Sequence, residues 1–448
     1  MLKKTLEKYM LEPFERYFKL ESSSGVVLLI ATLIALLISN SPWADSYYNF
    51  WHQESGIQIN ESFKVNAPLI HWVNDGLMAI FFFHIGLEIK RELLVGHLSS
   101  FQKASLPILA ALGGILLPVI IYILFNNNPQ VDNGWGIPMA TDIAFSLAIL
   151  KLLGKKVPIG LKVFLTTFAI ADDIGAVLVI ALFYSSDIHW DLIILSLLIL
   201  AMLLILSKFG LYSKYIFFPA NCIIWFLFLE SGIHPTLSGI LVAFTIPIQR
   251  RSNFNDFFHQ ITHSIKELNK SRSANPQINI PLNIKQVNIV EKLEVLIKGI
   301  RSPLQNLERK LHVYVAFGIL PLFALANAGV SFTSQCSNCF DLSLLIGASL
   351  LLGKCIGISL LSFLAVKLKI AVLPEGVNYG QIIGVSVLGG LGFTMAIFIT
   401  NLAFFDIQYI NAAKIGILIA SVLAGIIGYL IIRFYIQPKR MAKQTITE

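Results

Sequence analysis

The 448-residue sequence predicts an all-α polytopic membrane protein with about 12 transmembrane helices. Hydrophobic residues make up 56% of the chain, and charged residues only 13%, about half the usual share for a soluble protein. The mean hydropathy of +0.73 reflects the same excess. A disordered chain, a coiled coil and a secreted disulfide scaffold are excluded, the last because four cysteines are too few for a disulfide framework.

Twelve apolar segments, some of them interrupted, approach the roughly 20 residues that a membrane span needs. They cover about 23–40, 68–90, 104–125, 137–151, 159–184, 190–208, 212–230, 233–247, 312–331, 342–366, 379–403 and 408–435. The predicted organisation is an amphipathic N-terminal lead (1–22), spans one to eight (23–249), a long loop (250–310), spans nine to twelve (311–435) and a tail (436–448). The lead is too polar, and too long before its apolar run, for a cleaved signal peptide.

Basic residues alternate between the loops and predict the orientation. The loops after odd-numbered spans contain Lys64 and no other Lys or Arg. The loops after even-numbered spans contain the residues Lys90, Arg91, Lys103, Lys151, Lys155, Lys156, Lys208, Lys214, Lys367 and Lys369. Because cytoplasmic loops are enriched in Lys and Arg, both termini and the 250–310 loop are expected in the cytoplasm. The net charge of +8 therefore indicates membrane loops and not a nucleic-acid partner.

Two features lie outside the spans. Within 250–310, FNDFFHQITHSIKEL and VEKLEVLIKGI have helical apolar spacing and could lie along the bilayer surface, although a solvated loop is favoured over a dedicated partner site. On the external side, Cys336 and Cys339 form a C-x-x-C that could close a disulfide. No His or further Cys lies near it, so neither a metal site nor any cofactor is expected.

Ionisable side chains inside the spans are the candidates for function, since each costs about 2.5–3.5 kcal/mol at the centre of a membrane helix. The residues in mid-span are Asp142, Asp172, Asp173 and Lys354. Those nearer to span ends are Asp75, Glu88, Glu230, His234 and Lys414.

Asp172 and Asp173 are flanked by apolar residues on both sides, which disfavours the alternative of a helix-end cap. Adjacent helical residues point about 100° apart, so the two carboxylates have different tasks but can share one cavity wall. Two ionised carboxylates repel in a low-dielectric cavity, so at least one is expected to hold a proton near neutral pH. Such a group can hold a proton or a cation but not both, which is the property of an exchanger.

Lys354, in LLLGKCIGISLL, is the expected counter-charge. Pairing with a carboxylate on another span offsets the cost of burying it. A desolvated amine also releases its proton more readily, which makes Lys354 a candidate proton carrier. A snorkelling lysine is the alternative, disfavoured because both loop ends are distant.

Two spans have features of broken helices. Pro138 precedes Thr141 and Asp142 in span four, and span eleven contains the cluster LGGLGF. Unwound backbone is tolerated in a membrane only where it is buried or lines a cavity, and paired interrupted spans are typical of secondary transporters with inverted repeats. Asp142 could balance positive half-helix ends and Lys354 negative ones. LGGLGF alone would fit close helix packing equally well.

With these residues in place, the chain resembles the NhaA-type sodium/proton antiporter family. This family is itself among the transporters from which the association of interrupted spans with inverted repeats is known. The resemblance is carried by FFFHIGLEIKREL, GWGIPMATDIAFSLAIL, FLTTFAIADDIGAVLVIALFY, SGIHPTLSGI, ILPLFALANAGV and LGGLGFTMAIFIT. It implies an electrogenic exchanger of the bacterial inner membrane that takes up more than one proton per sodium ion expelled. It also implies an inverted repeat of spans three to five against ten to twelve, with spans four and eleven unwound where they cross.

The same resemblance implies roles for individual residues. Asp173 matches the principal cation-binding carboxylate, and Asp172 its partner, paired with Lys354. Thr141 and Asp142 match residues of the unwound segment beside the site and are expected to contribute to cation binding with the Asp pair. The matches to residues linked with pH response are Glu88, His234 and Glu308. Cys355 after Lys354, where the family usually has Pro, and Arg309 after Glu308, where it often has His, are departures.

These observations predict a pH-regulated Na⁺ or Li⁺/H⁺ antiporter, not an enzyme, in which protons and cations compete at the Asp pair. The expected partners are Na⁺, Li⁺, H⁺ and membrane lipids, with a possible homodimer. The alternatives are a cation channel, another proton-coupled transporter, and an intramembrane aspartyl protease using Asp142 and Asp172. A channel usually has a repeated or symmetric selectivity element, and the sequence shows none, which disfavours this alternative. The protease is disfavoured because the G-x-G-D context is absent.

Overall fold

A computed structural model of the chain describes residues 23–60, 63–185, 188–248, 254–273, 284–300, 302–331 and 339–436. The fold is all-α and polytopic, as predicted. The predicted lead (1–22), the tail beyond residue 436 and Cys336, with its predicted disulfide, lie outside the described residues.

Within the described residues, seven continuous helical segments are long and apolar enough to cross a membrane. They are Leu69–Leu94 (ending in α4, Met78–Leu94), α5 (Phe101–Phe125), α7 (Ile159–Phe183), α8 (Trp190–Lys208), Pro303–Asn327 (α13, Pro303–Tyr314; a π-helical turn; α14, Leu320–Asn327), Phe340–Lys367 (α15, Cys339–Ala348; a π-helical turn, Ser349–Gly353; α16, Lys354–Lys367) and α19 (Ile407–Tyr435).

Three further spans are bent pairs of helices. Helix Ser23–Ser39 is followed by α2 (Ala44–His52) at 114°, the 3₁₀ helix Pro129–Met139 by α6 (Ile143–Leu152) at 47°, and α17 (Tyr379–Leu388) by α18 (Phe393–Ala403) at 44°. The short helices α9 (Lys214–Glu230) and α10 (Thr236–Thr245) account for the other two, so all 12 expected segments contain helix. Span four starts earlier than predicted, because the polar residues from Pro129 onward form its first half.

Spans three to five and ten to twelve share one order: continuous, broken, continuous. The breaks bend by similar angles, 47° and 44°, in agreement with the predicted repeat. The two triplets pack closely through α5 and α16, where a Cβ atom built on Gly113 would lie 2.1 Å from the carbonyl oxygen of Gly357. Small residues at a helix crossing allow this approach of two backbones.

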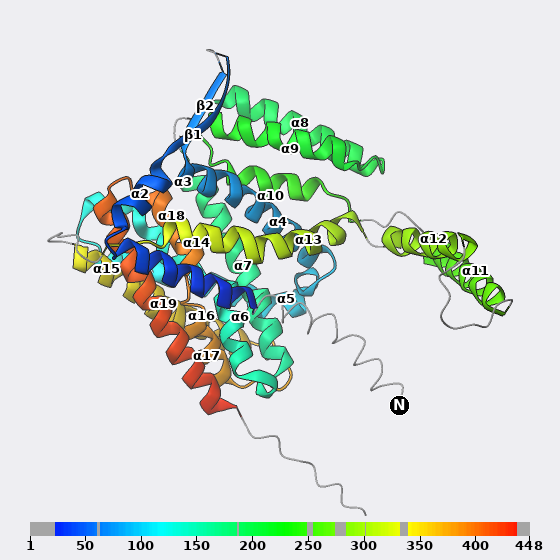
Figure 1. The fold of residues 1–448 in the computed structure, drawn as a ribbon. Helices are drawn as coiled ribbons and strands as arrows, with labels where there is room; N and C mark the ends of the chain where they lie inside the picture. The colour runs from blue at the N-terminus through cyan, green and yellow to red at the C-terminus, as the bar shows by residue number, and fades with distance from the viewer. Residues whose placement is uncertain are drawn as a thin grey trace, which may run out of the picture.

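Two elements project from the bundle in Figure 1. The antiparallel hairpin of β1 (Glu54–Asn60) and β2 (Phe63–Pro68) lies between the first two spans and was not predicted. Helices α11 (Phe254–Ser273) and α12 (Ile284–Ile300) extend to one side, and they contain the two stretches with helical spacing in the long loop.

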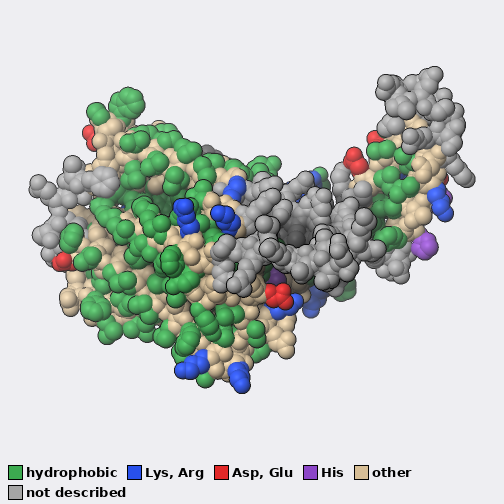
Figure 2. All heavy atoms as spheres, turned by 90° about the horizontal axis from the view of Figure 1, so that it is seen from below, with side chains coloured by type: hydrophobic (Ala, Val, Ile, Leu, Met, Phe, Trp, Pro, Cys, Tyr) green, Lys and Arg blue, Asp and Glu red, His purple; other side chains and the backbone are tan. Residues whose placement is uncertain are grey.

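The outer surface of the bundle is apolar. Figure 2 shows a face covered largely by hydrophobic side chains, with Lys and Arg in small groups. Large hydrophobic residues stay exposed along the spans, among them Leu116 (53%), Leu198 (63%) and Val422 (60%). In water this surface would be unstable, but against lipid tails it needs no cover. The polar side chains considered next lie inside.

Candidate ion-binding site

The two breaks in spans four and eleven hold each other's backbone. The Asp142 N–H donates to the carbonyl of Leu391, and the Thr141 hydroxyl donates to the carbonyl of Gly389 at 3.0 Å. These backbone groups, freed by unwinding, are thus satisfied inside the protein, as a membrane interior requires. Pro138 lacks an N–H and so favours a break in span four. Gly392 allows close approach, since a Cβ atom there would lie 3.0 Å from the carbonyl oxygen of Ala140.

Asp142 caps two helices at once. One carboxylate oxygen accepts the N–H of Phe145 in the first turn of α6 at 3.2 Å. The other accepts the N–H of Thr394 at 3.1 Å and its hydroxyl at 2.6 Å, in the first turn of α18. The N-cap residue of α18 is Gly392, which has no side chain for this task. Asp142 therefore offsets the positive ends of two half-helices that point at one place.

Asp172 and Lys354 form a fully buried ion pair. The Lys354 Nζ lies 2.6 Å from Asp172 Oδ2, and neither side chain is exposed (0% for both). Lys354 also donates to the Thr141 hydroxyl at 2.9 Å, which ties the pair to the break in span four. A π-helical turn, Ser349–Gly353, directly precedes Lys354 and is typical of functional sites. The second oxygen of Asp172 is buried with no hydrogen-bond partner in the described part of the chain.

Asp173 has different surroundings on the same helix, α7. It is 5% exposed, and no side chain or N–H group among the described residues donates a hydrogen bond to it. The negative charges of Asp172, Glu88 and Asp142 act on it, with Lys354 the opposing cation. Asp173 is thus a nearly buried carboxylate without a bound donor, beside one that has a cation.

A second charged cluster joins α4 to α13. The Arg91 guanidinium lies 2.7 Å from Glu92, 2.9 Å from Glu308 and 3.8 Å from Glu88. The rings of His84 and His312 lie close by in the same helices, with centroids 5.6 Å apart. Glu88 therefore shares the Arg91 guanidinium with Glu92 and Glu308.

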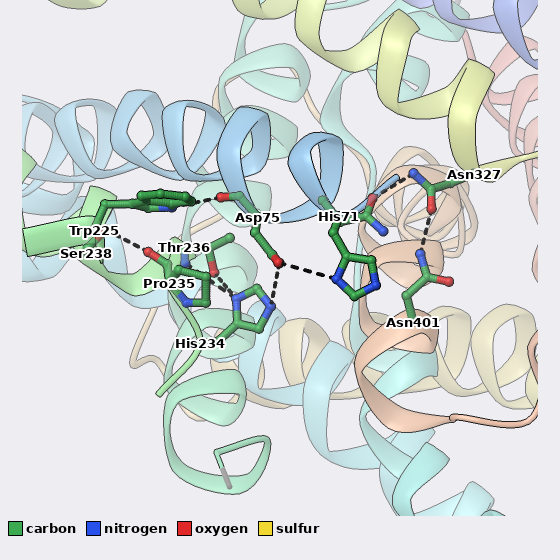
Figure 3. A network of polar contacts seen from close by, with 10 residues as sticks. His71, Asp75, Trp225, His234, Pro235, Thr236, Ser238, Asn327 and Asn401 are labelled. Carbon is green, nitrogen blue, oxygen red and sulfur yellow. Dashed lines mark hydrogen bonds and ion pairs between the residues drawn. The ribbon is translucent and has the colours of Figure 1, made fainter. Parts of the chain in front are cut away.

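His234 lies in a separate polar network (Figure 3). Its Nε2 is 3.6 Å from Asp75, whose other oxygen lies 3.9 Å from His71, and its Nδ1 is 2.7 Å from the Thr236 hydroxyl. A ladder of amides continues nearby: Asn401 donates to Asn327 at 2.7 Å, and Asn327 donates to Asn74 at 2.8 Å. The ladder links α18 to α14 and to the segment carrying Asp75.

The structure therefore brings together five of the residues selected from the sequence, namely Thr141, Asp142, Asp172, Asp173 and Lys354. Glu88 and Glu308 meet at Arg91, and His234 contacts Asp75 instead. Sequence reasoning missed Thr394 and Arg91 as partners. The i, i+3 spacing of Glu88 and Arg91 on one helix could have indicated Arg91 as a partner.

A polytopic helical protein with two broken spans meeting beside buried, oppositely charged side chains belongs to the class of secondary transporters. The family model described as Na+/H+ antiporter 1 matches residues 15–432. The chain belongs to this family, the NhaA-type sodium/proton antiporters.

Individual relatives are similar to this chain over nearly its full length. The Na(+)/H(+) antiporter NhaA 1 of Saccharophagus degradans is 43% identical over 427 residues, covering 94% of this chain and 91% of its own length. NhaA proteins of Parabacteroides distasonis (40% over 444 residues; 96% and 98% covered) and Sulfurimonas denitrificans (43% over 429; 94% and 95%) are similar to it as well. The chain is therefore a multi-pass membrane transporter and not an enzyme, which excludes the protease alternative. Its fold and family are consistent with a bacterial inner membrane.

Proposed function

We propose that this protein is an electrogenic, pH-regulated antiporter that expels Na⁺ or Li⁺ in exchange for protons, with both ions competing for the Asp172–Asp173 pair. The observation that carries the proposal is the contrast between these neighbours. Asp172 is paired with Lys354 at 2.6 Å, whereas Asp173 has no donor in the described part of the chain.

Asp173 is the principal exchange group in this proposal. A nearly buried carboxylate without a hydrogen-bond donor is unstable as a bare anion, because burial removes its hydration. It must acquire a proton or a cation. Na⁺ and Li⁺ are hard cations that take oxygen ligands, and carboxylate oxygens with water would supply them. One proton therefore leaves for each cation that binds at Asp173.

Asp172 and Lys354 provide a second, coupled change. A cation bound between the two carboxylates would compete with the Lys354 ammonium for Asp172. A lysine displaced from its anion in a buried site loses its proton readily, so Lys354 is the candidate carrier of a further proton. Release of two protons for one Na⁺ would make the exchange electrogenic. The Thr141 hydroxyl, freed by the same displacement, becomes available as a cation ligand.

Asp142 is assigned mainly to charge compensation, although the sequence also suggested cation binding. Both of its oxygens already accept hydrogen bonds at the ends of α6 and α18. A cation there would have to compete with two helix ends. The positions of α6 and α18 are instead coupled through Asp142, which suits two half-helices that move together during alternating access.

The pH response is proposed to involve Glu88 and Glu308 through Arg91, and His234 through Asp75. Arg91 bridges two helices, so a change in the protonation of its carboxylate partners would alter how α4 and α13 pack. His234 and Asp75 occupy a second place where protonation changes a charge contact. The cytoplasmic location of both termini, the lipid partners and the homodimer remain predictions within this proposal.

Exchange in proteoliposomes tests the central assignment. Asp173→Asn keeps the shape of the side chain but removes its charge, and we expect Na⁺- and Li⁺-driven proton movement to fall to the background of empty liposomes. Asp191→Asn, at an exposed position at the start of α8, is the matched control and should keep full exchange. Full exchange by Asp173→Asn would contradict the proposal.

A further inference from the structure

An apolar groove of about 490 Å³ lies on the outside of the helix crossing. Its walls come from helix Ser23–Ser39, α6, α19 and the break between α17 and α18. They include Leu29, Phe145, Leu391, Phe393 and Val422. The inner wall is therefore the crossing itself: Phe145 and Phe393 stand in the first turns of α6 and α18, and their rings lie 5.3 Å apart, edge to face.

The rim of the groove belongs to the surface that faces the bilayer. Its exposed residues include Val26 (53%), Leu152 (75%), Val422 (60%) and Ile426 (54%), all apolar. Water has too few polar partners to be stable in a groove with such walls. In a membrane, the medium that reaches this rim consists of lipid acyl chains.

Basic side chains stand at one end of the groove. Arg433, exposed near the end of α19, continues the stripe of Val422, Ile426 and Tyr429 at helical spacing. On the other wall, Lys151 near the end of α6 places its Nζ 3.1 Å from the Ser23 hydroxyl, two residues before the groove residue Gly25. By the distribution of Lys and Arg, this end is the cytoplasmic one.

We propose that the groove binds one acyl chain of an anionic phospholipid from this leaflet, with the headgroup phosphate between Lys151 and Arg433. Basic positions beside apolar grooves on the cytoplasmic side suit anionic lipid headgroups. The chain would run from the basic end towards Leu391 and Phe393, and would cover the lipid side of the two breaks. The site is separate from the Asp172–Asp173 pair and does not depend on its role.

Native mass spectrometry of the delipidated full-length protein tests this site, with phosphatidylglycerol and phosphatidylcholine as the added lipids. We expect one tightly bound phosphatidylglycerol per chain, and a loss of affinity of about tenfold or more in the double variant Lys151→Gln/Arg433→Gln. Lys208→Gln/Lys214→Gln, at basic positions near the ends of α8 and α9, is the matched control and should bind like the wild type.

A groove-filling variant tests the apolar half independently. Val422→Trp places a large ring over the groove and should displace the tightly bound lipid, whereas Leu198→Trp on lipid-facing α8 should not. Equal affinity of the wild type for both lipids would overturn the proposal. Unchanged lipid binding in both Lys151→Gln/Arg433→Gln and Val422→Trp would overturn it as well. Tight lipid binding that appears only after residues 1–22 are deleted would also overturn it, since the occupant of the groove would then be the chain's own N-terminal segment.

Discussion

Two adjacent aspartates on one helix, α7, have contrasting surroundings. Asp172 and Lys354 compensate each other at 2.6 Å with no exposure, while Asp173 has no donor among the described residues. A buried ion pair is costly to break by removing one member, because the remaining charge is left uncompensated. Substitution of Asp172 should therefore mainly affect stability, and substitution of Asp173 should mainly affect transport.

Neutralising each aspartate in turn should show this separation. Asp172→Asn leaves Lys354 without an anion, so we expect a loss of about 3–5 kcal/mol of stability. Asp173→Asn removes a repelled charge and should leave the melting temperature unchanged or higher, although exchange is lost. Thermal unfolding in detergent measures both.

A double-mutant cycle provides the control. Asp172→Asn/Lys354→Gln removes both charges, so its loss of stability should be smaller than the sum of the two single losses. If the losses were simply additive, or if Asp173→Asn were as unstable as Asp172→Asn, the contrast between the two aspartates would be refuted.

Much of the site was visible in the sequence because a charge inside an apolar run is costly and therefore conspicuous. This reasoning selected Asp142, Asp172, Asp173 and Lys354. It could not select Thr394, since a hydroxyl is common in membrane helices and its partner Asp142 is 252 residues away along the chain. Partners joined only by tertiary structure leave no local pattern.

At the scale of helices, the crossing depends on close approach of backbones. The contact of α5 with α16 has Gly113 opposite Gly357, where a Cβ atom would come within 2.1 Å of a carbonyl oxygen. Lys354 begins α16, so the spacing of these two helices also sets the position of the ion pair.

Adding one methyl group should reveal this dependence. Gly113→Ala should force α5 and α16 apart and lower both the melting temperature and the exchange rate, with a cost of about 1–3 kcal/mol for overpacking. Gly318→Ala is the matched control, because nothing lies within 4 Å of a Cβ atom built there. Equal melting temperatures and exchange rates in the two variants would contradict the role given to this crossing.

The breaks themselves could be predicted from Pro138 and the cluster LGGLGF, but several boundaries could not. The polar segment from Pro129 resembles a loop, yet it forms the 3₁₀ half of span four: its polar side chains, such as Gln130 and Asp132, stay exposed, whereas Val131 and Ile137 between and after them are buried. The hairpin β1–β2 was missed, since two short strands leave little periodic signal within a chain dominated by apolar helices. Neither affects the position of the ion-binding site.

At the scale of the whole molecule, the distribution of Lys and Arg predicts which side of the membrane each end of the bundle faces. Single cysteines in a cysteine-free background test this on intact cells. Asp132→Cys, at an exposed position in span four, should react with a membrane-impermeant maleimide from outside, and Lys208→Cys should react only after the cells are opened. The reverse pattern would invert the proposed direction of transport.

The central claim is that a proton and an alkali cation exclude each other at Asp173. The most direct measurement is proton release when Na⁺ is added to the purified protein in weakly buffered detergent, repeated over a series of pH values. We predict that Na⁺ releases protons from the wild type, that K151Q/R433Q releases as many, and that Asp173→Asn releases clearly fewer. If Na⁺ binds without releasing protons, or Asp173→Asn releases as many as the wild type, the competition does not occur at this carboxylate.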